Sequence, residues 1–452
     1  MANSIKIKKG TNIRLAGEAN KTLETPARAQ MFAVRPPDFH GVTPKLMVKE
    51  GDRVTAGSAL FHDKYDERIL FASPVSGSIK EIVRGEKRRV LAITIQADAS
   101  NEYKSFSTQS AASYKKQALM ELLLEAGMWP FVMQRPYSVV ANPTLTPKAI
   151  FVSGFDSAPL APDTDFVLNG EMENFQEGMN ALKVLADGKA VHLCYKAGSS
   201  ALKSVQGATL HEVSGPHPAG NVGVQIHHID PINKGEVVWY VDYQNVANIG
   251  RFLKTGKTDI YRVVALTGSE IEAPKYYKLT VGSQLSNVLQ GQLKGDNVRV
   301  ISGNVLTGET SSKDGFLGYY EQQITCIPEG NEPQFLLTTG WLGLGFDKFS
   351  VSRTFPTWLM PQSKKFKLNT NNNGEERAFV VTGQYEEVFP FDIYPVQLLK
   401  AIMTNDLDGM EKLGIYEIGP EDFALCEYVC TSKINVQQIV RQGLDVARVE
   451  FS

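Results

Sequence analysis

Two similar turn sequences, KEGDRVTAG at 49–57 and PVSGSIKEI at 74–82, constrain the N-terminal part of the chain more than any other feature. Short runs of strand-forming residues surround them, including MFAVRP, RILFASPV and RVLAITIQ, with glycine, proline and charged residues between the runs. Each turn carries a glycine, which takes a positive φ at little cost where the chain reverses. The pattern predicts a small β-barrel built from two related halves.

This pattern resembles a biotinyl/lipoyl-like β-barrel, a domain that presents a modified lysine at a hairpin tip. Lys64 lies where that tip is expected, within FHDKYDERI. The context is charged and bulky, and the loop is longer than a carrier hairpin allows. We therefore expect an unmodified, solvated lysine beside Asp63, Asp66 and Glu67.

The remaining sequence predicts an α/β multidomain protein, because 452 residues are too many for one core. Strand-like and helix-like segments alternate through KAIFVSGFD, ENFQEGMNALKVLADG, KAVHLCYKAG and SSALKSVQG, which predicts a parallel, Rossmann-like sheet. The segment 261–289 is β-rich with one short helix, as in a β-grasp module, and the sequence past Pro395 turns helical.

Five parts are therefore expected along the chain. They are N-terminal strands with the biotinyl/lipoyl-like domain (1–100), a Rossmann-like α/β domain (101–257), a β-grasp, soluble-ligand-binding (SLBB-like) module (258–330), a connecting segment (331–375) and a C-terminal helical domain (376–452).

Composition narrows the class of protein. Formal net charge is −2, from 47 basic and 49 acidic residues, and we find no basic stripe, so we expect no nucleic-acid partner. No charge-free apolar run reaches the ~18–20 residues of a membrane-spanning helix, and MANSIKIKKG lacks the apolar core of an export signal. Four cysteines do not make a disulfide framework, which favours a reducing cytoplasm.

The cysteines form an incomplete ligand set. Cys426 and Cys430 are four residues apart, which predicts both on one face of a helix that begins near Pro420. Two thiolates make neither an iron–sulfur site nor a closed zinc site, and Cys194 and Cys326 would have to come from other domains. Buried packing cysteines are the simpler interpretation.

Four of the seven histidines lie in HEVSGPHPAGNVGVQIHHIDP: His211, His217, His227 and His228. Their spacing matches no zinc helix motif, so we expect no metal site. No GxGxxG or Walker A fingerprint follows a strand, and GWLGLGFDK at 340–348 has glycines without a βαβ frame. We expect no catalytic and no cofactor-binding residue.

The stretch FSVSRTFPTWLMP at 349–361 is a candidate docking surface. It offers Phe349, Phe355, Trp358 and Leu359, with Met360 beside them, and such residues are enriched at protein interfaces. Buried core is the alternative.

Seven motifs, in order along nearly the whole chain, carry a family resemblance. They are IKIKKGTNIRLAG, VKEGDRVTAGSALFHDK with FASPVSGSIKEIVRGEKRRV, LLEAGMWPFVMQRPYSVVANP, PKAIFVSGFDSAPLAPD, SGPHPAGNVGVQIHHIDPI, GWLGLGFDKFSVSRTF, and FPFDIYPVQLLKAIMTNDLDGMEKLGIYEIGPEDFALCEYVC. The chain resembles the A subunits of sodium-translocating NADH:quinone reductases.

That family is similar in turn to the C subunit of the Rnf complex and to the NADH- and FMN-binding subunit of complex I. Those relatives carry a glycine-rich flavin loop and a four-cysteine cluster motif. This chain lacks the loop and keeps only Cys426 and Cys430. The resemblance therefore implies an inherited architecture with no cofactor bound by this chain.

The resemblance implies a peripheral subunit on the cytoplasmic face of the inner membrane, docked on the other five subunits (B to F), chiefly the membrane-embedded B subunit. It implies that the complex passes electrons from NADH to ubiquinone or menaquinone, coupled to Na⁺ export, with FAD, FMN, riboflavin and iron–sulfur in other subunits. The isolated chain would have no catalytic activity. His217 and His227 could hydrogen-bond a quinone, with plain loop histidines as the alternative.

Two other functions stay open. One is a carrier protein with lipoate or biotin on Lys64, which intact mass would reveal. The other is an independent flavin-dependent NADH dehydrogenase, which would oxidise NADH alone.

Overall fold

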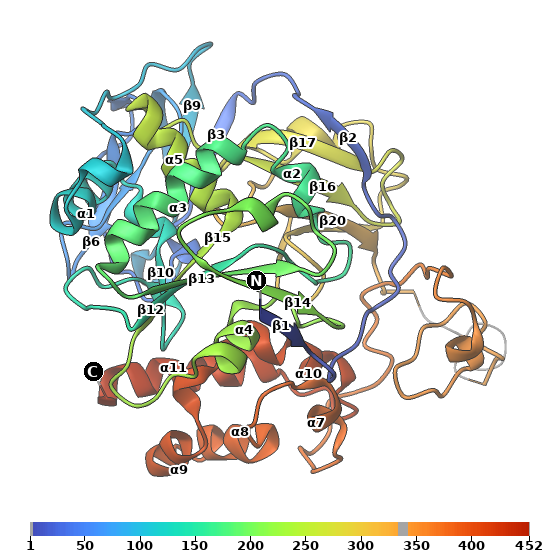
Figure 1. Ribbon diagram of the computed structural model, residues 1–452. Coiled ribbons are helices and arrows are strands. Elements are labelled where there is room, and N and C mark those ends of the chain that lie inside the picture. Colours follow the sequence, from blue (N-terminus) through green and yellow to red (C-terminus); the bar gives the residue numbers. More distant parts are fainter. Residues whose placement is uncertain (1–2, 333–341, 452) are drawn as a thin grey trace.

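The computed structural model describes residues 3–332 and 342–451 (Figure 1). The glycine stretch at 340–348 and the connecting segment at 331–375 therefore lie partly outside the described residues. Three sheet systems and a group of C-terminal helices make up the described chain.

Two small antiparallel sheets form the N-terminal barrel. Their strands are β3 (Met31–Val34), β9 (Val90–Ala97), β8 (Gly77–Arg84) and β5 (Arg53–Val54) in one sheet, and β4 (Pro44–Leu46), β6 (Ala59–Asp63) and β7 (Leu70–Ala72) in the other. The rings of Phe61 and Phe71 stack 4.5 Å apart, and Phe39 packs against both. All three rings are buried and belong to one hydrophobic core cluster.

The central sheet has seven strands, of which five are parallel. In order they are β1 (Asn3–Lys6), β14 (Thr209–Ser214), β13 (Ala190–Lys196), β12 (Ala149–Ser153), β15 (Val238–Asp242), β10 (Met133–Arg135) and β11 (Val139–Val140); β10 pairs antiparallel with both β15 and β11. In β12, Ile150 and Val152 belong to the core on one face, and Ala149 and Phe151 to the core on the other. The sheet is therefore covered on both faces, as parallel sheets generally are.

Helices cover the two faces of this sheet differently. On one face lie α3 (Met172–Ala186) and α5 (Tyr243–Thr255), with α1 (Lys116–Glu125) and the short α2 (Thr164–Val167) beside them. On the other face lie α4 (Val222–Ile229) and the C-terminal helices α7 (Gln384–Val388), α8 (Pro395–Met403), α9 (Leu407–Lys412), α10 (Ala424–Val429) and α11 (Val436–Phe451). Figure 1 shows α4 and the red C-terminal helices together below the sheet.

The third sheet is mixed, with both parallel and antiparallel strand pairs. Its order is β19 (Glu309–Ser311), β18 (Val298–Ser302), β20 (Gln323–Pro328), β16 (Tyr261–Thr267), β17 (Lys275–Thr280) and β2 (Asn20–Glu24), with the short helix α6 (Ser286–Leu289) nearby. The N-terminal segment thus gives β1 to the central sheet and β2 to this one. The boundaries expected from the sequence stay predictions.

Local helix predictions had different outcomes. The helix expected before Gly127 is confirmed as α1, and Gly127 follows it with φ 66°. The helix expected in SSALKSVQG is wrong, because only a 3₁₀ turn at Leu202–Ser204 forms there. Gly198 and Gly207, on either side of this turn, both have a positive φ, which interrupts a right-handed helix. Among the described helices, none combines the length and apolarity needed to cross a bilayer.

Candidate functional site

Loops that follow three parallel strands meet at the carboxyl edge of the central sheet. Asn12 follows β1, Ser157 follows β12 and His217 follows β14. The Asn12 side chain accepts a hydrogen bond from the backbone N–H of His217 at 2.9 Å, and the His217 ring lies 3.0 Å from the Ser157 hydroxyl. This edge is where open α/β sheets generally bind ligands.

Two hydrogen bonds hold the Ser157 hydroxyl beside the His217 ring. The Ser157 oxygen accepts from the backbone N–H of Gly220 at 2.7 Å, so its own proton is available to His217 Nδ1. Because a serine hydroxyl can accept two hydrogen bonds and donate one, this geometry is compatible with either tautomer of the neutral ring. Burial lowers the pKa of His217 to about 4. His217 can therefore donate a hydrogen bond at neutral pH, but it carries no extra proton to give.

His227 belongs to a different network. Its Nδ1 lies 2.7 Å from the Glu417 carboxylate, and its Nε2 accepts from the backbone N–H of Asp392 at 3.0 Å. Its ring also packs 5.0 Å from that of Phe391. Both ring nitrogens have hydrogen-bond partners, so His227 links α4 to the C-terminal part of the chain. The structure does not place His217 and His227 in one shared hydrogen-bond network.

A fully buried arginine joins the sheet to the C-terminal helices, and sequence analysis missed it. Arg135, at the end of β10, donates to the Asp422 carboxylate at 2.7 Å and to the Glu417 carbonyl at 2.9 Å, and pairs with Glu421. Burial opposes its charge, but Asp422 and Glu421 outweigh burial and hold the pKa of Arg135 above its usual range. Burial raises the pKa of Asp422 to about 6, and the charge of Arg135 opposes this rise. The RP and GPED sequences were the available signal.

The helix N-termini at this edge are capped by the chain's own carboxylates. Asp163 accepts from the first turn of α2, and Asp242 accepts from the backbone N–H groups of two residues in the first turn of α5, at 2.9 and 3.0 Å. At the start of α4, a Cβ on Gly223 would come within 2.4 Å of the Asp422 carboxylate. A phosphate needs such N-termini free and suffers repulsion from carboxylates.

The crevice between β12 and β15, where the strand order reverses, is filled by the mixed sheet. Gln322, just before β20, donates to the Asp242 carboxylate at 3.2 Å and accepts from Gln244 at 3.1 Å. Asp156 follows β12 at the same edge, and burial raises its pKa. A flavin or dinucleotide does not fit these residues, because its phosphate would meet carboxylates and the Gln322 side chain.

The cysteines are buried and dispersed. Cys194 lies in β13, Cys326 in β20 and Cys426 in α10, while Cys430 follows the end of that helix. Burial raises the pKa of Cys326 to about 12 and that of Cys426 well above its usual value. Within residues 3–332 and 342–451, no three or more His, Cys, Asp or Glu side chains gather as a metal would require.

Lys64 is exposed in the turn between β6 and β7. Its backbone N–H donates to the Thr43 carbonyl at 2.9 Å, and the Asp63 carboxylate accepts from the backbone N–H of Thr43 and, more weakly, of Tyr65. The turn is therefore fastened to its neighbours through backbone contacts. Nothing in this geometry prevents modification of the lysine.

The stretch at 349–361 contains both exposed and half-buried apolar residues. Trp358 and Leu359 are exposed, in a 3₁₀ helix at Pro356–Leu359, whereas Phe349, Phe355 and Met360 are half-buried.

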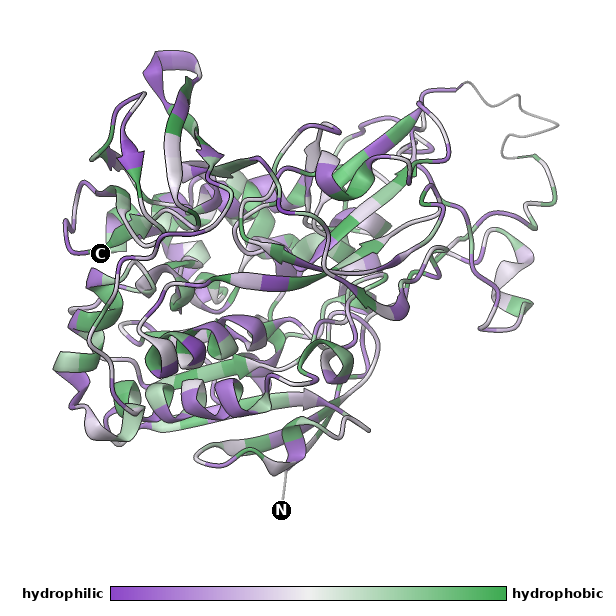
Figure 2. Ribbon diagram, turned by 90° about the horizontal axis from the view of Figure 1, so that it is seen from above, coloured by the Kyte–Doolittle hydropathy of each residue, from purple (hydrophilic) through white to green (hydrophobic). Residues whose placement is uncertain are grey.

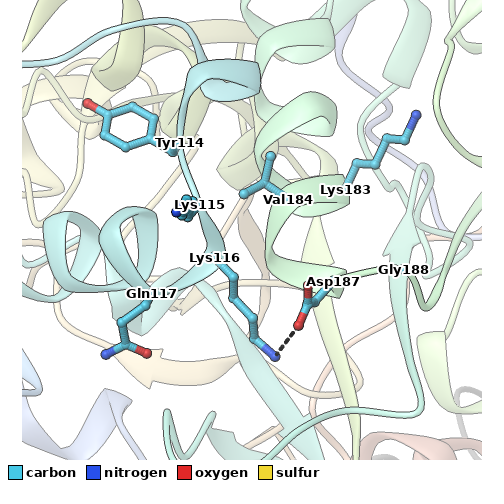
Figure 3. Close-up of a pocket in the computed structure, with 8 residues that line it drawn as sticks. All are labelled: Tyr114, Lys115, Lys116, Gln117, Lys183, Val184, Asp187 and Gly188. Carbon is cyan, nitrogen blue, oxygen red and sulfur yellow. Dashed lines mark ion pairs between the residues drawn. The ribbon is translucent and has the colours of Figure 1, made fainter.

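A surface depression of about 590 Å³ lies elsewhere, between the start of α1 and the end of α3 (Figure 3). Lysines line it, and Lys116 pairs with Asp187 at 3.9 Å. Because α3 ends at the amino edge of the strands, this depression is remote from His217.

Together these features define a multidomain α/β protein: a small two-sheet barrel, a parallel sheet whose nucleotide crevice is filled, a mixed sheet and a helical C-terminus. Three family models match it in that order. They are described as NqrA N-terminal barrel-sandwich hybrid domain (residues 5–98), NqrA second alpha/beta domain (114–258) and NQRA C-terminal domain (263–313).

Curated relatives match over the full length. The A subunit of the Na(+)-translocating NADH-quinone reductase from Marinomonas sp. (strain MWYL1) is 37% identical over 98% of this chain and 99% of its own. The corresponding subunits from Haemophilus influenzae, 37% identical over 98% of each chain, and Rhodopirellula baltica, 36% identical over 97% of each, match similarly. The chain belongs to the family of A subunits of the Na(+)-translocating NADH-quinone reductase.

One solved structure with a distant likeness comes from a hydrogenase. A chain of an NAD+-reducing [NiFe]-hydrogenase in the air-oxidized state is 10% identical, over 76% of this chain and 62% of that one, with a TM-score of 0.38. At that score the likeness supports no argument about this chain.

Proposed function

We propose that this chain is a peripheral scaffold subunit of a respiratory complex that passes electrons from NADH to ubiquinone or menaquinone and exports Na⁺. The observation that carries the proposal is the full-length match to the Marinomonas A subunit, 37% identical over 98% of the chain. Its partners are the other five subunits, B to F, chiefly the membrane-embedded B subunit. Its place is the cytoplasmic face of the inner membrane.

In this proposal the flavins, the iron–sulfur centre and the NADH site belong to the other subunits. Carboxylate caps at Asp163 and Asp242 and the inserted Gln322 side chain support this assignment, since they oppose a phosphate-bearing cofactor. The buried, dispersed cysteines support it for iron.

A contribution to quinone binding is a second part of the proposal, and it concerns His217 more than His227. Both ring nitrogens of His227 are hydrogen-bonded to residues of the C-terminal part, whereas the side-chain hydrogen bond of His217 is made through Nδ1 to the Ser157 hydroxyl. His217 is 4% exposed, so a quinone carbonyl would reach it only after an adjoining loop moves.

Depletion and reconstitution test the main proposal. The complex is purified with and without this chain, and Na⁺-stimulated NADH:quinone activity is measured. We expect activity to fall without the chain and to return when the purified chain is added. A depleted complex that keeps full Na⁺-coupled quinone reduction would contradict the proposal.

Substitution of His217 by Gln tests the quinone contribution in the reconstituted complex. Loss of one hydrogen bond to the quinone predicts a rise in the quinone KM of about tenfold, with the NADH KM unchanged. His228→Gln is the matched control, because His228 is exposed on the same loop–helix unit. Equal effects of the two substitutions would remove His217 from the proposal.

A further inference from the structure

Exposed apolar side chains gather in residues 342–367, which we call the outlying segment. Figures 1 and 2 show this part of the chain projecting from the molecule beyond the mixed sheet. Its large exposed hydrophobic residues are Leu342, Leu344, Phe346, Trp358 and Leu359, and Leu344 and Leu359 are 74% and 69% exposed. Several exposed apolar residues concentrated in one segment indicate an interaction surface.

The base of the outlying segment is held in a defined conformation. Arg14 donates to the carbonyl oxygens of Thr357 at 2.6 Å and Pro361 at 3.0 Å. Its guanidinium also lies over the Phe366 ring, 5.0 Å from the centre. The backbone N–H of Phe366 donates to the Arg14 carbonyl at 2.7 Å, and the Phe366 carbonyl accepts from the backbone N–H of Ala16 at 2.9 Å. These contacts fix both ends of the 3₁₀ helix at Pro356–Leu359 while Trp358 and Leu359 face outward.

The charge of the outlying segment differs from that of the chain. It contains five basic residues, Lys348, Arg353, Lys364, Lys365 and Lys367, and one acidic residue, Asp347, within a chain of net charge −2. Lys367 pairs with Glu270 at 2.7 Å. Arg353, Lys364 and Lys365 are exposed, and Arg353 lies 5.5 Å from the centre of the Trp358 ring. The apolar side chains thus have exposed cations beside them.

We propose that the outlying segment docks on an anionic lipid surface. Leu344, Trp358 and Leu359 enter the boundary between headgroups and acyl chains, and the exposed cations contact lipid phosphates. Protein interfaces are depleted in lysine, whereas peripheral lipid contacts combine tryptophan and leucine with lysine and arginine. This inference rests on one part of the proposed function, the location of the chain beside a membrane. It does not depend on which subunits the chain binds.

Vesicle binding by the purified full-length chain tests this inference. The vesicles are phosphatidylethanolamine mixed with phosphatidylglycerol, or phosphatidylcholine alone, and binding is measured by co-sedimentation. We expect binding to the anionic vesicles, weakened by salt, and little binding to phosphatidylcholine. The double substitution W358S/L359S should reduce the partition coefficient at least about tenfold, and K364Q/K365Q should reduce it on anionic vesicles only.

The matched control is Y394S/M403S, which removes two exposed hydrophobic residues at the two ends of α8, outside the outlying segment. It should leave vesicle binding unchanged, and circular dichroism should show all variants folded. Absence of wild-type binding to anionic vesicles, or equal binding by W358S/L359S, would overturn the inference. So would a W358S/L359S chain that binds vesicles normally but no longer joins the other subunits, since the surface would then serve a protein partner. Because vesicle binding is measured on the purified chain alone, its result is independent of whether the chain assembles into the complex.

Discussion

Arg135 and Asp422 are separated by 287 residues, yet neither side chain of this ion pair is exposed to solvent. Such a pair contributes little net stability compared with an apolar replacement, but breaking it leaves one charge buried without a partner. The RP and GPED sequences mark the two residues separately, but no local pattern shows that they pair across 287 positions. His217, in contrast, was singled out from the sequence, although its low pKa depends on burial that no local pattern shows.

Asp422→Asn tests the buried pair. The uncompensated Arg135 charge should lower the free energy of unfolding by on the order of 3–5 kcal/mol, measured by urea denaturation. The control is Glu421→Gln, because the Glu421 side chain is 34% exposed and water can replace it; its cost should stay below about 1 kcal/mol. Similar losses in both variants would mean that Asp422 is not the principal partner.

Glu321 gives a pH-dependent prediction. Burial, and then the nearby Asp38 carboxyl, raise the pKa of Glu321 to about 8 despite the opposing charge of Arg262. Because this value exceeds the unfolded one of about 4.3, the stabilising contribution is complete below about pH 4 and is lost as the pH rises toward 8. Glu321→Gln should therefore be more stable than the wild type at pH 8.5, by more than about 1 kcal/mol, and closer to it at pH 5.5. Thermal unfolding at both pH values measures this, and a constant difference would exclude Glu321 as the titrating group.

At the scale of elements, periodicity predicted α1 and the strand–helix alternation of the central domain, because those signals are local. The sheets that β1 and β2 join could not be predicted, because β1 pairs with a strand about two hundred residues away. The same holds for the C-terminal helices, which were expected as a domain and cover one face of the central sheet. The close crossing of α3 and α5 depends on Gly178 and Gly250, which look like poor helix residues in the sequence.

The helix crossing predicts the effect of a single methyl group. A Cβ on Gly178 would lie 2.0 Å from the Val246 carbonyl oxygen, and one on Gly250 would lie 1.8 Å from that of Asn174. Gly178→Ala or Gly250→Ala should therefore cost about 1–3 kcal/mol of stability through overpacking. Gly295→Ala is the control, because nothing lies within 4 Å of its Cβ position. Denaturation midpoints measure the effect; a stabilised Gly178→Ala chain would show that the helices can separate.

At the scale of the whole molecule, the central sheet has side chains in its nucleotide crevice, whereas the barrel leaves its hairpin lysine exposed. The barrel hairpin carries Lys64 in a charged turn, and the nucleotide crevice is occupied by Gln322 and Asp242. For the barrel this predicts an intact mass equal to that of the unmodified polypeptide when the complex is purified from its host. It also predicts that Lys64→Arg supports full activity. An added lipoyl or biotinyl mass would establish the carrier alternative.

Flavin and iron content of the purified chain tests the central claim most directly. Absorbance after acid extraction gives flavin per chain, and elemental analysis gives iron per chain, on protein taken from assembled complex rather than refolded material. The filled crevice and dispersed cysteines predict both values far below one. One flavin or a stoichiometric amount of iron per chain would contradict the account.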